Sequence, residues 1–426
     1  MTDATITTAI RAGRLLDVEA GEVRTDQLVL LASDRIHEVR PWTDADPDLP
    51  AGIEVLDLSG HTVSPGLIDL HAHLVGQTEV ETGANYAALV MRSGAQEAMN
   101  GVRNARNTLE AGFTTVRDVG TFRAFVDVAL RDGIEAGWTP GPRMLCAGAY
   151  LTCSQGGGDV TGLAADVDAV VPRDLRFGVA NSVDEVRTRV REILHFHADF
   201  IKVIATGAVM TQGTNPGTPE FTEDQLRVAV ETAAEHGTFV AAHAHGAEGI
   251  KQAVRAGVRS IEHGSLMDDE AIAMMRDHGT YLVADIYCGD YIDEMGREHG
   301  WPVETLRKNT ETTQAQRDGF AKAVELGVRC GFGTDSGIYP HGWNAKQLAY
   351  MVRFGMTPMQ AIRSATIVAA ECMDWSDRVG SIAPGKFADL VAVAGDGLAD
   401  IGAFEDVALV IKGGEIVKDT RADDER

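Results

Sequence analysis

The sequence lacks any run of 18 apolar residues, so no segment reads as a transmembrane helix. Its first ten residues, MTDATITTAI, lack the basic and apolar regions of a secretory signal. We therefore expect a cytoplasmic protein. The five cysteines form no CxxC pair and are odd in number, which indicates neither a disulfide framework nor a thiolate zinc site.

Basic residues are also scarce. Lys and Arg number 38 against 63 Asp and Glu, which gives a formal net charge of −25 at pH 7. This negative charge is spread along the chain and repels the phosphates of nucleic acids and anionic lipids. We expect neither a nucleic-acid partner nor a membrane partner. The length of 426 residues still allows a sizeable core, in one large domain with an appendage or in two to three domains.

Both ends of the chain are rich in short β segments. The first 63 residues contain ITTAIRAGRLLD, QLVLLA, RIHEVRPW and GHTV, separated by Gly, Asp and Pro turns. The last forty residues repeat this pattern in ADLVAVAG, VALVIKGG and EIVKD. The two ends most simply pair with each other, which predicts a small β-sandwich domain made of residues 1–63 and 385–426.

Between the two ends, apolar strand-like runs alternate with amphipathic helical patterns such as 182–197, 222–236, 268–277 and 312–326. The runs are GLIDLHAHL, FTTVRDVG, PRMLCAGAY, DFIKVIATG, TFVAAHAHG, VRSIEHG, TYLVADIY and VRCGFGTD. Eight strands alternating with helices predict an α/β chain with a (β/α)8, TIM-like barrel over residues 64–384. In that architecture, catalytic residues lie at the carboxyl ends of the strands.

Polar residues stand at or near the ends of five of these runs. His71 and His73 are two residues apart, so on a strand their rings share one face and could reach one ion. His195 and His197 have the same spacing on a helical pattern, where side chains diverge by about 200°, and we expect them at the surface. The other four runs supply Lys202, His243 with His245, His263, and Asp335.

A lysine inside an apolar strand requires a reason, because an unpaired buried charge is costly. Lys202 could form an ion pair with an acid in the barrel interior. Alternatively, its amine is neutral part of the time and takes up carbon dioxide. The resulting carbamate is an anion able to bridge two metal ions.

This set of residues resembles the metal-dependent amidohydrolase superfamily over nearly the whole chain. The family has HxH on the first barrel strand, a carboxylated lysine on the fourth, histidines on the fifth and sixth, and an aspartate on the eighth. HAH, IKV, AHAHG, IEHG and GTDS match this pattern in type and order. TTVRDVG, DFIKVIATG, AAHAHG and SIEHGSLMDD look most like the dipeptidase and carboxypeptidase branch, which includes prolidase-like enzymes and ochratoxin-hydrolysing amidohydrolases.

The resemblance implies a binuclear metal centre. His71, His73 and Asp335 would bind the deeper ion, His243 and His263 the outer one, and carboxylated Lys202 would bridge them. Zinc suits these ligands best, although manganese, cobalt or iron can occupy similar sites. A metal-bridging hydroxide would attack an amide carbonyl, with Asp335 as the catalytic base. We expect His245 to act at the catalytic site by contacting the substrate, with a seventh ligand as the alternative.

The substrate is less well defined. Relatives often carry Gly-Gly-His-Gly-Asp after the third strand, and their histidine helps to hold the substrate, whereas this chain reads CSQGGGD with Gly157 at that position. Arg117, Tyr287 and His341 are further candidate substrate contacts by location alone, and each could equally be structural. We expect hydrolysis of the C–N bond of a dipeptide, an N-acyl amino acid or a longer peptide. A dedicated peptide-tailoring amidohydrolase in ribosomal-peptide natural-product biosynthesis is the alternative.

Other classes of function remain as competitors. A non-catalytic barrel could serve as a scaffold for protein contacts, since a fold does not fix a function. A lyase or isomerase could use the same metal ions, and a deaminase could release ammonia. The carboxylated-lysine pattern disfavours the deaminase. The resemblance also implies a small-molecule or peptide substrate as the partner, and a homo-oligomer.

Overall fold

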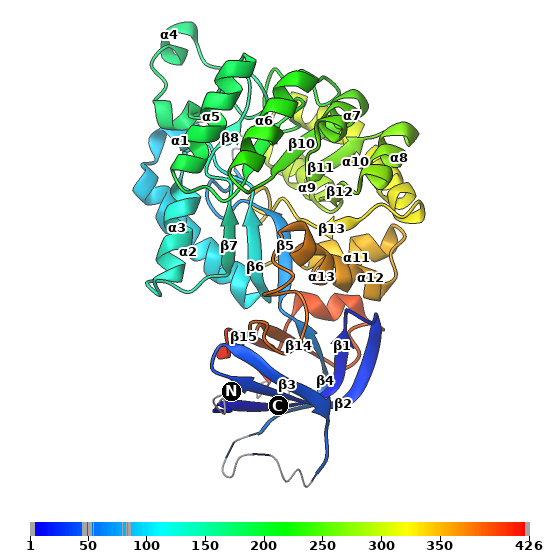
Figure 1. The fold of residues 1–426 in the computed structure, drawn as a ribbon. Helices are drawn as coiled ribbons and strands as arrows, with labels where there is room; N and C mark the ends of the chain where they lie inside the picture. Colours follow the sequence, from blue (N-terminus) through cyan, green and yellow to red (C-terminus); the bar gives the residue numbers. More distant parts are fainter. Residues whose placement is uncertain are drawn as a thin grey trace. The chain divides into compact units, whose positions relative to one another are not determined.

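The computed structural model describes residues 5–421 apart from 45–48, 50–52, 54, 79, 82 and 84–86. It shows an α/β chain with three hydrogen-bonded sheets (Figure 1). The chain divides into two compact units: one contains the described residues of Met1–Asp69, Arg106–Thr115 and Gly342–Arg426, and the other those of Leu70–Ala105 and Val116–His341. Among the described helices, none combines the length and the apolar character needed to cross a bilayer.

Both chain ends contribute to a seven-stranded sheet, as their β-rich patterns predicted. Its order is β16-β15-β14-β4-β1-β2-β3. The strands are β1 (Thr8–Asp17), β2 (Glu22–Ala32), β3 (Arg35–Pro41), β4 (Val55–Pro65), β14 (Leu390–Ala394), β15 (Leu409–Lys412) and β16 (Glu415–Asp419). The two ends meet where β4 pairs antiparallel with β14, with Val63 opposite Ala392.

This sheet closes over its own apolar core. Ile36 N in β3 donates to Lys386 O at 2.9 Å, and Ala388 N donates to Asp34 O at 2.8 Å, so the segment before β14 lies against β3. The enclosed side chains include Ile10, Leu15, Val29, Leu31, Ile36, Leu58, Val63, Leu390, Leu409 and Ile411. The β-sandwich description and its boundaries, 1–63 with 385–426, stay predictions, as does the barrel boundary 64–384.

Each of the eight predicted apolar runs contains a strand. A three-stranded sheet, β5-β6-β7, holds β5 (Leu67–Ala72), β6 (Phe113–Asp118) and β7 (Arg143–Cys146). A six-stranded sheet holds the short β8 (Tyr150–Leu151), then β9 (Ile201–Ile204), β10 (Val240–Gly246), β11 (Ser260–Leu266), β12 (Tyr281–Ala284) and β13 (Cys330–Phe332). Neighbouring strands from β8 to β13 are parallel. A parallel bridge joins Ala72 to Ser336, and closure of the two sheets into a (β/α)8 barrel stays a prediction.

Helices follow most of these strands. They are α1 (Ala87–Met91), α2 (Gly94–Glu110), α3 (Val126–Glu135), α4 (Ala165–Asp168), α5 (Val183–His195), α6 (Glu223–Glu235), α7 (Ala247–Ala256), α8 (Asp269–His278), α9 (Cys288–His299), α10 (Val303–Glu325), α11 (Lys346–Arg353), α12 (Pro358–Ser364) and α13 (Ile367–Cys372), with 3-10 turns at Arg173–Arg176 and Ile401–Glu405. The four predicted helical patterns are confirmed in α5, α6, α8 and the longer α10. Capping boxes at Ser182 and Thr222 fix where α5 and α6 begin. His195 and His197 are exposed, as expected.

Gly13 in β1 provides a test of the packing between β1 and β4. A Cβ atom at Gly13 would lie 1.9 Å from the backbone oxygen of Ser59, whereas a Cβ at neighbouring Gly60 would meet nothing within 4 Å. We expect Gly13→Ala to destabilise the protein by an amount at or above the upper end of the range of about 1–3 kcal/mol typical of overpacking. Gly60→Ala is the matched control, and thermal unfolding measures both. Equal melting temperatures for the two variants would contradict the close approach of these strands.

Candidate metal centre

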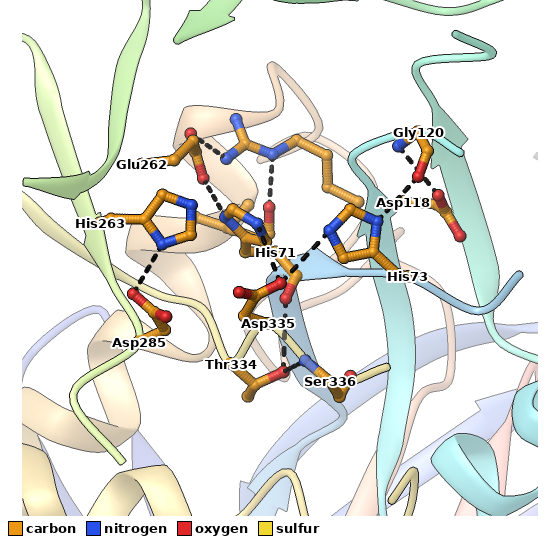
Figure 2. A network of polar contacts seen from close by, with 12 residues as sticks. His71, His73, Asp118, Gly120, Glu262, His263, Asp285, Thr334, Asp335 and Ser336 are labelled. Atoms are coloured by element: carbon orange, nitrogen blue, oxygen red, sulfur yellow. Dashed lines mark hydrogen bonds and ion pairs between the residues drawn. The ribbon is translucent and has the colours of Figure 1, made fainter. Parts of the chain in front are cut away.

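The strand ends bring all the predicted metal ligands to one pocket within the second compact unit. The pocket has an empty volume of about 1440 Å³, including space open to solvent. Its walls contain His71, His73, Lys202, His243, His245, His263 and Asp335. Figure 2 shows the imidazoles of His71 and His73 directed toward the carboxylate of Asp335. The sequence pattern therefore corresponds to a real cluster in space.

Asp335 lies between the two histidines of the HxH motif. Its Oδ1 atom is 3.3 Å from His73 Nε2 and 3.5 Å from His71 Nε2. Burial alone would raise the pKa of Asp335, but the hydrogen bond and the charge of His73 hold this pKa below its ordinary value. The residue has φ 57°, and His263 has φ 69°, both in the left-handed region that side chains rarely adopt. Such local strain is typical of functional sites, where surrounding structure fixes the direction of a side chain.

Hydrogen bonds behind four of the histidines fix their ring orientations. His71 Nδ1 contacts Glu262 Oε2 at 2.9 Å, and His263 Nδ1 contacts Asp285 Oδ1 at 2.9 Å. The Nδ1 atom of His73 contacts Gly120 O at 2.8 Å, and that of His245 contacts the Ser265 hydroxyl at 2.8 Å. This leaves Nε2 of each ring as the available ligand atom. His243 differs, because its Nε2 contacts Gly207 O at 3.2 Å and leaves Nδ1 available.

The electrostatic environment keeps several of these rings neutral. Burial lowers the pKa values of His71, His243 and His245 well below the ordinary value, so their imidazoles have a free lone pair for an ion at neutral pH. Burial would also lower the pKa values of His73 and His263, but the neighbouring carboxylates of Asp335 and Asp285 raise both. The site thus combines neutral nitrogen donors with carboxylates, which is the ligand chemistry of a divalent transition metal.

Lys202 is the unusual member of the cluster. Its side chain is buried, and its Nζ atom has no hydrogen-bond partner among the described residues. Burial lowers the pKa of this amine to about 8, despite the opposing negative charge of Glu262. The amine is therefore neutral in part of the molecules near neutral pH, which is the state that reacts with carbon dioxide.

Three sets of donor atoms are close enough to share an ion. His71, His263 and Asp335 each offer an atom within 4.8 Å of the others, and so do His243, His245 and His263. The third set is Asp285, Cys288 and Asp335, and His263 belongs to the first two. His245 belongs to the second set and lines the pocket, so its role as substrate contact or ligand stays a prediction.

The four other predicted substrate contacts divide into two kinds. Gly157 lines the pocket, whereas Arg117, Tyr287 and His341 are not among its lining residues. Arg117 is fully buried and donates to Glu262 Oε1 at 2.7 Å and to Leu70 O at 2.6 Å. In this position Arg117 supports the acid behind His71. Its predicted contact with a substrate stays a prediction.

His341 and Tyr287 contact other parts of the protein chain. His341 Nε2 contacts His73 O at 2.9 Å, and burial lowers the pKa of His341 to about 3. The ring of Tyr287 packs edge-on against Tyr339, with 5.0 Å between ring centroids. Like Arg117, these residues belong to the structural surroundings of the site, so their predicted substrate contacts are not supported by their positions.

Glu262 and Asp285, the two acids behind His71 and His263, were not predicted from the sequence. Glu262 is fully buried and also accepts hydrogen bonds from Arg117 and Ser260. Asp285 accepts from Gln316 Nε2 at 2.7 Å. Each acid stands within an apolar run, which is a signal that the sequence offered. Glu262 directly precedes the candidate ligand His263 in SIEHG, and Asp285 lies in VADIY, on the next strand along the chain.

The peptide of Gly157 is held from both sides. Its N–H donates to Glu220 Oε2 at 2.8 Å, and its carbonyl accepts from Thr211 Oγ1 at 2.6 Å. A Cβ atom at Gly157 would lie 3.1 Å from both Ala208 Cβ and Ile204 Cγ2. Ala208 and Ile204 therefore occupy the space that the first atom of a side chain at Gly157 would need. The glycine does not simply leave extra room in the pocket.

The site gathers nitrogen and oxygen donors that could hold a metal ion. Comparison with known proteins identifies the family. Residues 62–417 match the amidohydrolase family, to which the chain belongs. It is 32% identical to ochratoxinase of Aspergillus niger over 98% of this chain and 88% of that one.

Two solved structures are also similar. A Xaa-Pro dipeptidase with methionine bound in its active site has a TM-score of 0.89 and 37% identity, over 96% of this chain and 99% of that one. A prolidase complexed with N-methylphosphonate-L-proline has a TM-score of 0.87 and 32% identity, over 97% of this chain and all of that one. These relatives confirm the branch predicted from the sequence, and they indicate that the chain is a hydrolase whose fold is a TIM-like barrel with an additional domain.

Glu220, which holds the Gly157 peptide, gives a prediction for the pH dependence of stability. Burial raises the pKa of this carboxyl to about 7, so the folded state binds more protons than the unfolded state between about pH 4.5 and 7. Its contribution to stability is therefore complete below that range and is lost as the pH rises through about 7. We expect Glu220→Gln to lose less stability than the wild type between about pH 5 and 8, measured by chemical unfolding.

The exposed Glu235 supplies the control, as Glu235→Gln should leave the pH profile of stability unchanged. A Glu220→Gln profile parallel to that of the wild type would show that this carboxyl has an ordinary pKa in the folded protein.

Proposed function

We propose that this protein is a metal-dependent hydrolase of amide or peptide C–N bonds. The observation that carries the proposal is the buried Lys202 amine, which has no hydrogen-bond partner among the described residues although it lines a pocket rich in histidine. A polar atom in this position is costly unless something absent from the protein chain satisfies it. A carbamate that binds metal would remove that cost.

The residues present fit two divalent ions. His71, His73 and Asp335 would hold the deeper ion, His243 and His263 the outer one, and Lys202 as a carbamate would join them. Zinc is the metal that we favour, because imidazole and carboxylate ligands suit it. When bound, the two ions supply an activated water molecule and polarise the carbonyl of the substrate.

The protein's own groups would carry the proton. Asp335 has a pKa below its ordinary value, so it is a carboxylate at neutral pH and can accept the proton of the attacking water. The same carboxyl would then deliver the proton to the leaving nitrogen. Glu262 and Asp285 hold the rings of His71 and His263 in place during these steps. His245 would contact the substrate.

The walls of the pocket favour a substrate with an apolar part. Its apolar and aromatic lining residues are Val75, Leu89, Phe122, Tyr150, Ile204, Ala208, Val209, Met210, Ile292 and Ile338. Such walls suit an apolar side chain or acyl group next to the scissile amide. A dipeptide or N-acyl amino acid agrees with this lining and with the names of the dipeptidase, prolidase and ochratoxinase relatives. The (β/α)8 barrel that we predict would place all the ligand-bearing strand ends on one rim.

A mass-spectrometric hydrolysis screen tests the proposed activity. Zinc-loaded protein would be incubated with N-acyl amino acids, with dipeptides of varied composition, and with longer modified or cyclic peptides. Asp335→Asn serves as the blank, and we expect it to keep the fold while losing about 10³-fold or more in turnover, because its amide cannot accept the proton.

Cleavage of dipeptides or N-acyl amino acids with an apolar group would support the proposal. Cleavage of long or cyclic peptides alone would identify a peptide-tailoring enzyme. An absence of cleavage in every class, in protein shown to contain metal, would argue for the non-catalytic scaffold.

Lys202→Ala tests the carbamate. Removing the amine should lower the bound metal from about two ions per chain to one or fewer, because the bridging ligand is lost. Metal content is read by inductively coupled plasma mass spectrometry after dialysis. Added acetate or propionate should restore part of the metal content by supplying a carboxylate in the vacated space.

Lys322→Ala, at an exposed lysine of α10, is the control for loss of a lysine elsewhere. If Lys202→Ala bound as much metal as the wild type, the proposal that Lys202 bridges the two ions would be wrong.

A further inference from the structure

One wall of the pocket is a segment without regular secondary structure that follows β9. Residues Ala208 to Thr211 of this segment line the pocket, and Ile204 at the end of β9 lines it as well. The segment is closed within itself by Thr214, whose hydroxyl accepts from Ala208 N at 3.1 Å and donates to Thr211 O at 3.0 Å. These internal bonds give the segment its shape but do not attach it to the rest of the molecule.

A charged pair on α10 attaches the segment, in addition to contacts such as Thr161 Oγ1, which donates to Gln212 O at 2.9 Å. Lys308 Nζ donates to Thr211 O at 2.7 Å and to Ala208 O at 3.3 Å, and it lies 2.7 Å from Glu304 Oε1. The same Glu304 oxygen accepts from Gly213 N at 3.0 Å. The lysine thus binds carbonyl groups of the segment, and the glutamate one helical turn away binds an N–H group.

The Lys308 ammonium group is buried in this contact. Its side chain is 1% exposed, whereas that of Glu304 is 36% exposed. A buried ammonium is costly unless it is paired and hydrogen-bonded, and here two carbonyls and one carboxylate provide its partners. Lys308 is not among the pocket-lining residues, so its direct contacts are with the segment and not with the space of the pocket.

We propose that Lys308 and Glu304 are positioning residues that clamp the segment 207–214 as a fixed wall of the substrate pocket. The clamp extends to Gly157 through Thr211. The carbonyl of Thr211 accepts a hydrogen bond from Lys308, and its hydroxyl donates one to Gly157 O at 2.6 Å. The two residues therefore fix the positions of the segment and of the adjoining Gly157 in the pocket wall. The kinetic part of this inference rests on the proposed amide hydrolysis, whereas the structural part does not.

The test uses Lys308→Met in the full-length, metal-loaded protein. Methionine fills a similar volume but cannot bind the two carbonyls, so the segment should loosen without a large cavity. We expect amide hydrogen exchange at residues 207–214 to become about tenfold faster or more, since local opening of this segment becomes easier. With a substrate from the hydrolysis screen, we expect KM to rise about tenfold while kcat changes less than about threefold.

Three further variants refine the test. Lys322→Met removes an exposed lysine from the same helix, and exchange in 207–214 should then match the wild type. Lys308→Arg keeps the charge and the donors, and it should return exchange part of the way to the wild-type rate. Glu304→Gln weakens the clamp from the other side, so it provides a second measurement if Lys308→Met fails to fold.

The outcomes separate this inference from the proposed function. Faster exchange in 207–214 in Lys308→Met or Glu304→Gln, with no change in Lys322→Met, supports the clamp even if no substrate has been found. Wild-type exchange in both clamp variants overturns it, even if the protein hydrolyses amides. A fall in kcat with unchanged KM would overturn the positioning role and indicate a part in the chemical step.

Discussion

The site depends on placing polar groups at the ends of apolar strands, where water cannot satisfy them. Lys202 is the extreme case, because its amine is buried and finds no hydrogen-bond partner among the described residues. The histidines around it are arranged so that each has one nitrogen held by an outer group and the other available. Burying such a cluster costs free energy when its polar atoms have no partners, and bound ions would offset that cost. The rest of the fold can be understood as the support for this arrangement.

The sequence predicted the fold class and the cluster because both leave periodic signals. Each of the eight apolar runs contains a strand, and the HxH spacing brought His71, in β5, and His73, directly after it, to one pocket. The order of ligand types along the chain then indicated the family, which the relatives confirm. Joining of the two chain ends in one sheet also followed from their similar composition of short β segments.

What the sequence could not show were contacts between residues distant along the chain. Arg117 looked like a substrate contact because it stands at a strand end, but its direction is fixed by Glu262, 145 residues later. Likewise, the sequence showed Gly157 in place of the histidine of relatives, but not that Ala208 and Ile204 approach it closely. Both depend on loop conformation and side-chain direction, for which a single sequence contains no periodic signal.

The pairing of β4 with β14 also has a consequence for synthesis of the protein. More than 300 residues separate these strands along the chain, so β4 emerges from the ribosome long before its partner exists. Until then its hydrogen-bonding edge can pair with other chains, and contacts of such long range form slowly. During synthesis the protein therefore passes through a stage in which β5 to β13 are complete while the seven-stranded sheet still lacks β14, β15 and β16. This stage is where a chaperone would act and where self-association would begin.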